Sequence, residues 1–210
     1  MPLAVPRCPR DHASNIGTRH MTGRVAMVPL EQAQALGAEM GLPPPMATRS
    51  AFRTLANNPP LLKAVFGQLS TLLLHNTFDT RLRELMIMRI GWVTGSVYEW
   101  TQHWRVATTA GIPPEDVLAV RDWRNAQHLT AADKAILAAT DESLAGKTLS
   151  DATWAEVVKY IPDPAQQVEF VVALGNWTLF SILLRHLKIP VEDGVAIWPP
   201  DGLVPPGAED

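Results

Sequence analysis

A glutamate and a histidine lie four residues apart in the middle of this 210-residue chain, at Glu99 and His103. If the segment is helical, their side chains are neighbours and can hydrogen-bond. A carboxylate beside an imidazole orients the ring and sets its tautomer, and partial burial moves the pKa of both groups away from the solution values. The pair is therefore suited to proton transfer.

The same pair falls on the side of the helix that is expected to face the protein core. The helix should cover residues 97–110, and its small apolar residues, spaced three and four apart, mark this side: Val106, Ala107 and Ala110. Continuing this stripe backwards leads to His103 and then Glu99, and Trp100 and Trp104 flank the pair and would shield it from water. The alternative is an ordinary Glu–His pair that only supports the helix.

A further carboxylate, Glu84, lies on the preceding apolar helix, which is expected over residues 80–93. Its face of that helix also carries four other residues: Ile87, Met88, Gly91 and Gly95. Two glycines on one face allow a second backbone to approach closely or leave room for a ligand. Glu84 is therefore a third candidate for catalysis, and the alternative is a salt bridge to Arg81, one turn back, or to a basic neighbour elsewhere.

The elements that must position these residues are all predicted to be helices. N-cap residues, helix-starting prolines and apolar periodicity indicate the following helical ranges: 50–57, 61–74, 80–93, 97–110, 113–124, 130–144, 150–160 and 165–188. No alternating strand and no fixed repeat is found, so the fold class is all-α. We divide the chain into a flexible N-terminal extension (1–28), one helical domain (29–191) and a Pro/Gly-rich C-terminal tail (192–210).

Composition excludes several classes of function. The formal net charge of −3 gives no electrostatic footprint for nucleic acid, and we find no run of about 18 apolar residues that would cross a membrane. The single cysteine, Cys8, cannot form an internal disulfide or take part in dithiol chemistry. Because the N-terminal residues contain no apolar segment typical of a secretory signal, we expect a cytoplasmic protein.

Three segments around the candidate site cover residues 79–85, 95–103 and 110–112. They resemble the central motif of the carboxymuconolactone decarboxylase and alkylhydroperoxidase D superfamily, and the similarity extends over about residues 27–191. This resemblance implies an alkylhydroperoxidase D-like helical bundle that assembles into trimers or hexamers, with pockets near the subunit interfaces.

The same resemblance bears on the reaction. The peroxidase branch of the superfamily carries a glutamate, a Cys-x-x-Cys pair and a histidine four residues after the second cysteine. Glu84 and His103 match the outer positions, but Ser96 and Glu99 stand at the cysteine positions. Without thiols there is no attack on a peroxide and no resolving disulfide, so we do not expect thiol peroxidase activity. The decarboxylase branch resembles this chain in having a glutamate four residues before the histidine.

We therefore hypothesise a cofactor-independent, decarboxylase-like lyase or isomerase acting on a small lactone or carboxylate. His103 would move the proton, Glu99 would orient it, and Glu84 would be a second acid. The residues expected to bind substrate are Ser96, Tyr98, Trp100, Trp104 and Asn176. For Asn176 the alternative is a hydrogen bond between helices in the core. Candidate donors to an enolate oxygen are Arg81, Arg83, Arg89 and Asn176.

Two other interpretations stay open. The chain could be a non-catalytic homo-oligomer that keeps the fold and binds a small molecule. A metal site could use Glu84, Glu99, His103 and His75, but the Glu-x-x-His spacing of di-iron bundles is three residues and the spacing here is four. We therefore expect no metal and no cofactor, and the expected partners are a small-molecule substrate and other copies of the chain.

Overall fold

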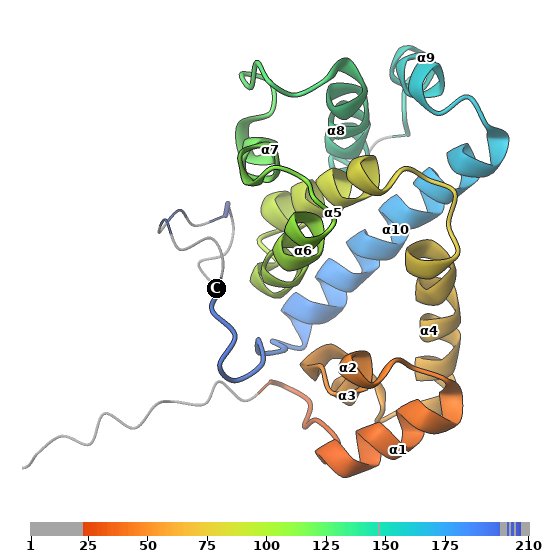
Figure 1. Ribbon diagram of the computed structural model, residues 1–210, viewed down its shortest axis with the longest axis vertical. Helices are drawn as coiled ribbons and strands as arrows, with labels where there is room; N and C mark the ends of the chain where they lie inside the picture. Colours follow the sequence, from red (N-terminus) through yellow and green to blue (C-terminus); the bar gives the residue numbers. More distant parts are fainter. Residues whose placement is uncertain (1–22, 147, 198–200, 202, 204, 207–210) are drawn as a thin grey trace, which may run out of the picture.

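The computed structural model describes residues 23–210 apart from 147, 198–200, 202, 204 and 207–210. Every regular element of this described part is a helix, so the all-α class is confirmed (Figure 1). The helices are α1 Leu30–Met40, α2 Pro44–Ala47, α3 Ser50–Leu55, α4 Pro59–Leu74, α5 Thr80–Thr94, α6 Val97–Thr109, α7 Pro114–Ala119, the short 3₁₀ helix η1 Val120–Asp122, α8 Ala131–Leu144, α9 Asp151–Tyr160 and α10 Pro164–His186.

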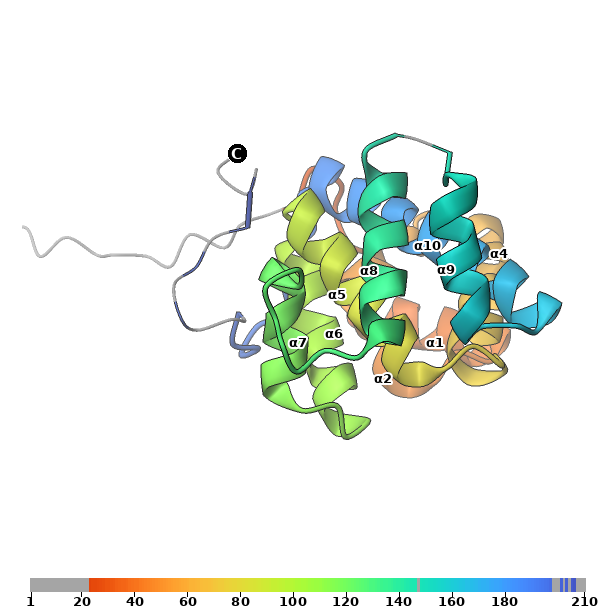
Figure 2. The same ribbon diagram turned by 90° about the horizontal axis from the view of Figure 1, so that it is seen from above.

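Helix α5 is the central element of the bundle. Figures 1 and 2 show it enclosed by α6, α8 and α10, all three of which contact it. Its fully buried apolar side chains are Leu85, Met86, Ile87, Met88 and Ile90. The consecutive residues 82–88 are all buried, so every side of this part of the helix faces the interior. Residues of α5 are therefore screened from water unless they meet a gap between the surrounding helices.

The helix starts follow the local signals in the sequence. The Asp79 carboxylate accepts a hydrogen bond from Leu82 N at 3.0 Å and caps α5. At α8, Thr130 and Asp133 form the expected capping box, in which each side chain accepts from the backbone N–H of the other residue. These caps satisfy N–H groups that have no partner within the helix.

The connection between α5 and α6 is short and tightly packed. Gly95 adopts the left-handed conformation with φ of 71°, and Ser96 N donates to Gly91 O at 2.8 Å. A Cβ added to Gly91 would lie 3.3 Å from the backbone nitrogen of Trp100. Of the two glycines that we noted on one face, Gly91 permits the close approach of the α6 backbone, whereas Gly95 provides the left-handed turn that ends α5.

Three features differ from the sequence-based expectation. Helix α1 was not predicted, because only Ala33 and Gly37 of its residues are buried and the apolar periodicity is weak. Helix α2 lies where no helix was predicted and begins in the proline run of residues 43–45, since proline is tolerated in the first helical turn. The segment predicted as one helix over 113–124 is divided between α7 and η1.

The described part of the expected N-terminal extension is bonded to the bundle. Arg24 N donates to Leu187 O at 2.8 Å, and Val28 N donates to Arg53 O at 3.2 Å. Residues 23–28 therefore lie against the ends of α3 and α10 instead of forming a flexible segment. Cys8 and the rest of residues 1–22 are outside the described part of the chain.

Helix α10 corrects our expectation that no apolar run is long enough to cross a membrane. By length and composition alone, this 23-residue helix is long and apolar enough to do so. One of its faces, however, supplies Phe170, Trp177, Phe180 and Leu184 to the core. Burial in the bundle accounts for the composition of that face.

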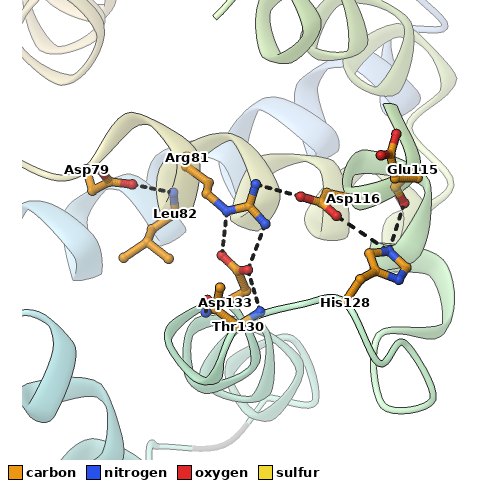
Figure 3. A network of polar contacts seen from close by, with 8 residues as sticks. All are labelled: Asp79, Arg81, Leu82, Glu115, Asp116, His128, Thr130 and Asp133. Atoms are coloured by element: carbon orange, nitrogen blue, oxygen red, sulfur yellow. Dashed lines mark hydrogen bonds and ion pairs between the residues drawn. The ribbon is translucent and has the colours of Figure 1, made fainter. Parts of the chain in front are cut away.

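An arginine at the start of α5 joins three helices (Figure 3). Arg81 donates to both carboxylate oxygens of Asp133 on α8, at 3.0 and 2.8 Å, and pairs with Asp116 on α7 at 2.7 Å. His128 Nε2 lies 3.5 Å from the other oxygen of Asp116. The alternative in which Arg81 pairs with Glu84 is therefore wrong.

We expect Asp133→Asn to lower the free energy of unfolding at neutral pH by roughly 2–4 kcal/mol, because Arg81 loses its main partner and the α8 cap is weakened. Burial raises the pKa of Asp133, but hydrogen bonds from Arg81 and Thr130 outweigh burial and hold it below its usual range. The stabilisation is thus present above the ordinary aspartate pKa and lost as the pH falls through the lowered one. Urea unfolding at several pH values measures both effects.

The matched control is Glu156→Gln, which removes an exposed pair with Lys159 on α9 and should change stability by under about 1 kcal/mol. Equal stability of Asp133→Asn and the wild type would contradict this account of the Arg81 network.

Candidate active site

Glu84 is completely buried on α5 and holds two partners. Its Oε2 lies 2.8 Å from His103 Nδ1, and its Oε1 accepts from Arg83 Nε at 3.1 Å. Burial raises the pKa of Glu84, but the interactions with His103 and Arg83 outweigh burial and bring it below its usual range. Glu84 is therefore a carboxylate at neutral pH.

His103 on α6 uses both ring nitrogens. Nδ1 faces Glu84, and Nε2 lies 3.0 Å from Trp177 Nε1 on α10. An indole N–H can only donate, so we assign Nε2 as an unprotonated acceptor and Nδ1 as the N–H that donates to Glu84. Trp177 thus caps the lone pair that would otherwise accept a proton, and the side chain of His103 is 14% exposed.

Glu99 has a different environment one turn away. It is buried between α6 and α10, and the Ser181 hydroxyl donates to its Oε2. Burial raises the pKa of Glu99 from its ordinary value of 4.5 to about 8, and the nearby hydroxyls of Ser181 and Ser96 oppose this shift only in part. Within the described residues, Glu99 Oε1 and Ser96 Oγ make no hydrogen bond of regular geometry. At neutral pH Glu99 is therefore mostly a neutral carboxylic acid with one oxygen unused.

The expected hydrogen bond between Glu99 and His103 is wrong. Helix α10 pairs with α6 through two contacts, Glu99 with Ser181 and His103 with Trp177, and both partners on α10 are also four residues apart. Glu99 comes before His103 in the chain, whereas its partner Ser181 comes after Trp177, so the two helices run antiparallel at this point. The carboxylate that orients His103 comes from α5 instead. Spacing along α6 showed which side chains could meet, but packing against α10 decided which of them do.

Sequence reasoning missed Trp177 and Ser181 as members of this cluster. The sequence does place them four residues apart on a long apolar helix. A hydroxyl and an indole N–H at that spacing are polar groups on the buried side of this helix.

The residues predicted to bind substrate lie in several places. Ser96 is buried beside Glu99, and Trp100 is buried against Trp92, with ring centroids 5.3 Å apart. Trp104 is partly exposed on α6. Tyr98 donates to Glu192 at 2.6 Å, and the remaining predicted residue, Asn176, accepts from the Gln68 amide at 2.9 Å. This hydrogen bond joins α4 and α10, so Asn176 has the helix-to-helix role that we gave as the alternative to substrate binding.

The arginines considered as donors to an enolate are engaged in structural contacts. Arg83 binds Glu84 and also donates to Leu72 O at 3.3 Å. Arg89 holds Asp141 on α8, with nitrogen–oxygen distances of 2.6 and 3.1 Å, and Arg81 holds Asp133. Among the described buried side chains of the candidate set, Glu99 Oε1, Ser96 Oγ and Asn176 Nδ2 are without a hydrogen bond.

The alternative of a metal site gains no geometric support. Among the described residues, no three side chains of His, Cys, Asp or Glu are grouped so that they could hold a metal ion. Glu99 faces Ser181 and Glu84 faces Arg83, so the carboxylates do not converge with His103 on one point.

The tautomer of His103 can be measured directly. In ¹⁵N NMR spectra of the wild-type protein near pH 7, we expect His103 to show a protonated Nδ1 and an unprotonated Nε2, because Glu84 accepts at one side and Trp177 donates at the other. Trp177→Phe should shift the Nε2 resonance and leave Nδ1 protonated. A proton on Nε2 in the wild type would contradict the assignment.

Glu99 should make the folded protein less stable as the pH rises. Its folded pKa of about 8 lies above the ordinary value of 4.5, so the favourable contribution is complete below the ordinary value and is lost as the pH rises through 8. The slope should approach about 1.4 kcal/mol per pH unit for one proton. We expect Glu99→Gln to remove this loss in thermal or urea unfolding followed from pH 5 to 8. Parallel pH profiles for variant and wild type would show that Glu99 ionises normally.

Comparisons with known proteins agree with this architecture. Residues 59–142 match the model of the carboxymuconolactone decarboxylase family. No curated protein matches the sequence.

Several solved structures share the fold. A peroxidase-related protein from Silicibacter sp. TM1040 has a TM-score of 0.69 and 11% identity, with 86% of this chain and 97% of that chain covered. An AhpD-like protein from Agrobacterium tumefaciens has a TM-score of 0.60 and 18% identity, with 66% and 96% covered. The debrominase Bmp8, in a cysteine-to-alanine variant bound to 2,3,4-tribromopyrrole, has a TM-score of 0.61 and 16% identity, with 78% and 84% covered.

At these identities the solved structures establish the fold, and the family match covers the segment from the start of α4 into α8, which includes Glu84, Glu99 and His103. Residues 59–142 thus match the carboxymuconolactone decarboxylase family, the chain as a whole has an AhpD-like fold, and its sequence contains no Cys-x-x-Cys pair.

Proposed function

We propose that this protein is a cofactor-independent enzyme, a decarboxylase-like lyase or isomerase, that moves a proton on a small lactone or carboxylate. The proposal rests on two buried carboxyl groups near one imidazole whose protonation states differ at neutral pH. The pKa of Glu84 is lowered, and that of Glu99 is raised to about 8. Environments that separate the pKa values of neighbouring groups are how an enzyme site provides a base and an acid at one pH.

In this proposal His103 is the base. Glu84 fixes the ring through Nδ1 and stabilises the imidazolium that forms when Nε2 takes a proton from the substrate. Nε2 becomes available when the substrate displaces the indole N–H of Trp177. Glu99, as the neutral acid, donates a hydrogen bond from its free side to the oxygen on which negative charge develops.

A small ring is the substrate type that the comparisons favour. The debrominase that shares this fold was captured with a brominated pyrrole. Ser96 and Glu99 here lack the thiol chemistry of a Cys-x-x-Cys pair, so the reaction we propose for this chain uses proton transfer alone.

A second candidate function is binding without turnover. The observation that favours it is the hydrogen bond of Trp177 to His103 Nε2, which leaves the resting imidazole without a free basic nitrogen. A ligand that binds tightly and never exchanges a proton with solvent would support this candidate.

The catalytic proposal can be tested by screening lactones and small carboxylates for turnover, or for exchange of a carbon-bound hydrogen with deuterated water. We expect His103→Gln and Glu84→Gln to lower the rate about 100-fold or more, as for loss of a general base. Arg124→Gln, an exposed control on the loop after η1, should leave the rate unchanged. Activity within a few-fold of wild type in both catalytic variants would exclude these roles.

The role of Glu99 has its own signature in the pH–rate profile. Because the neutral acid is the active form, activity should fall as the pH rises through about 8. Glu99→Gln keeps an N–H donor but has no proton to lose, so this alkaline loss should disappear while some activity remains. The same alkaline loss in the variant would assign it to another group.

We also propose that the protein is a homo-oligomer that uses the outer face of α10. Exposed apolar side chains follow this face at helical spacing: Val168, Val171, Val172, Leu179 and Ile182. A Cβ at Gly175, in the middle of this face, would meet nothing within 4 Å, so another helix could approach there. An exposed apolar stripe of this length is typical of an interface between copies.

We expect Leu179→Asp to dissociate the oligomer in size-exclusion chromatography with light scattering, since it places a charge in the apolar contact. Tyr160→Asp, on the exposed surface of α9, is the control and should keep the wild-type mass. A wild-type protein that runs as a monomer at micromolar concentration would contradict the proposal.

A further inference from the structure

Residues 190–197, which follow α10 and which we call the strap, lie along one face of α6. Figure 1 shows this C-terminal segment turning back past α6. The Glu192 carboxylate accepts hydrogen bonds from Tyr98 Oη at 2.6 Å, from Ser50 N at 2.8 Å and from the Gln102 amide. Gln102 is consequently buried. Three donors fix the start of the strap to the bundle.

Beyond this attachment, the strap and α6 border an open cavity of about 420 Å³, and Arg105 and Ile197 on its walls are exposed. Helix α6 contributes Thr101, Trp104 and Arg105, and the strap contributes residues 194–197. Gly194, with φ of 77°, provides the left-handed turn that brings the end of the strap over the helix. The volume is within the range of pockets that hold small organic ligands.

The lining of this cavity has a defined chemistry. Arg105 is the only charged residue among its lining residues, and no carboxylate among them opposes it. A guanidinium binds a carboxylate through two parallel hydrogen bonds. The indole of Trp104 and the apolar strap residues Val195, Ala196 and Ile197 suit a flat apolar body.

This cavity is separate from the acid–base cluster, by which we mean Glu84, Glu99 and His103. Glu99 and His103 are bonded to residues of α10, whereas Tyr98, Gln102 and Arg105 are on the side of α6 that the strap covers. A ligand here would not touch Glu84 or Trp177. The cavity can therefore bind a ligand whether or not the acid–base cluster is catalytic.

We propose that the cavity between α6 and the strap is a binding site for a small aromatic carboxylate, with Arg105 on the carboxylate, Trp104 on the ring and the strap as a cover held by Glu192. Part of the wall is lost when the strap detaches, so affinity depends on the Glu192 attachment as well as on Arg105.

Benzoate is the probe for the test, with benzyl alcohol as its uncharged analogue, and binding is measured by calorimetry and by tryptophan fluorescence of the full chain. We expect saturable benzoate binding with Kd on the order of 1 mM or lower, and weaker binding of benzyl alcohol. Arg105→Gln should weaken benzoate binding about 10-fold or more, and Arg105→Lys should recover part of it.

Arg124→Gln is the matched control, because Arg124 also lies over an indole, that of Trp123 at 4.3 Å, but does not line this cavity. It should leave benzoate binding unchanged. Tyr98→Phe, which removes one donor to Glu192, should speed hydrogen exchange in residues 190–197 and weaken benzoate binding several-fold.

Equal affinities of Arg105→Gln and wild type would overturn the proposal, as would equal weakening in Arg124→Gln or the lack of saturable binding up to roughly 10 mM. Since these readouts are binding and hydrogen exchange, they are independent of the turnover measurements that test the acid–base cluster.

Discussion

The buried negative charge of Glu84 is the constraint on which the arrangement of the bundle depends. A carboxylate without solvent contact is stable only when other groups supply hydrogen bonds and compensating charge. Arg83 supplies the charge and also binds Leu72 O at the end of α4, while His103 supplies the second hydrogen bond and is itself bonded to Trp177. One charge thereby connects α4, α5, α6 and α10. Loss of any partner would leave the carboxylate incompletely satisfied in the protein interior.

Glu99, one helical turn before His103, shows how a second buried carboxyl group takes the opposite protonation state to Glu84. Its identified partner is a serine hydroxyl, which stabilises a carboxylate much less than an arginine does, so burial dominates and the proton is retained. The contrast arises from the neighbouring helices: α5 presents Arg83 next to Glu84, whereas α10 presents Ser181 to Glu99. The superfamily fold thus provides two acid positions whose character is set by single neighbouring residues. Ser96 and Glu99 stand at the positions where the resemblance places cysteines, and Glu84 and His103 stand at the flanking glutamate and histidine positions.

The parts of this structure that sequence reasoning predicted are those with a local cause. Asp79 and Thr130 cap their helices through atoms three residues away, and Gly95 ends α5 because the left-handed conformation suits glycine. Sequence reasoning named Glu84 and His103, which do meet, but it paired His103 with Glu99 and missed Trp177 and Ser181. The observed pairing depends on the position of Trp177, more than seventy residues away in the chain. The strap was not predicted to shape a cavity because Glu192 carries no local pattern, and its three donors come from α6 and the start of α3.

The tight α5–α6 connection has a consequence for how the family can vary. Only Gly95 and Ser96 separate the two helices, and the backbone of Trp100 is packed against Gly91. An insertion of one residue near the start of α6 would rotate the following residues by about 100° relative to α5 and separate His103 from Glu84. Length changes in this superfamily should therefore accumulate in other connections, such as the one between α8 and α9. Homologues can instead diversify by substitutions on the α10 side, which alter the groups that surround the imidazole without moving it.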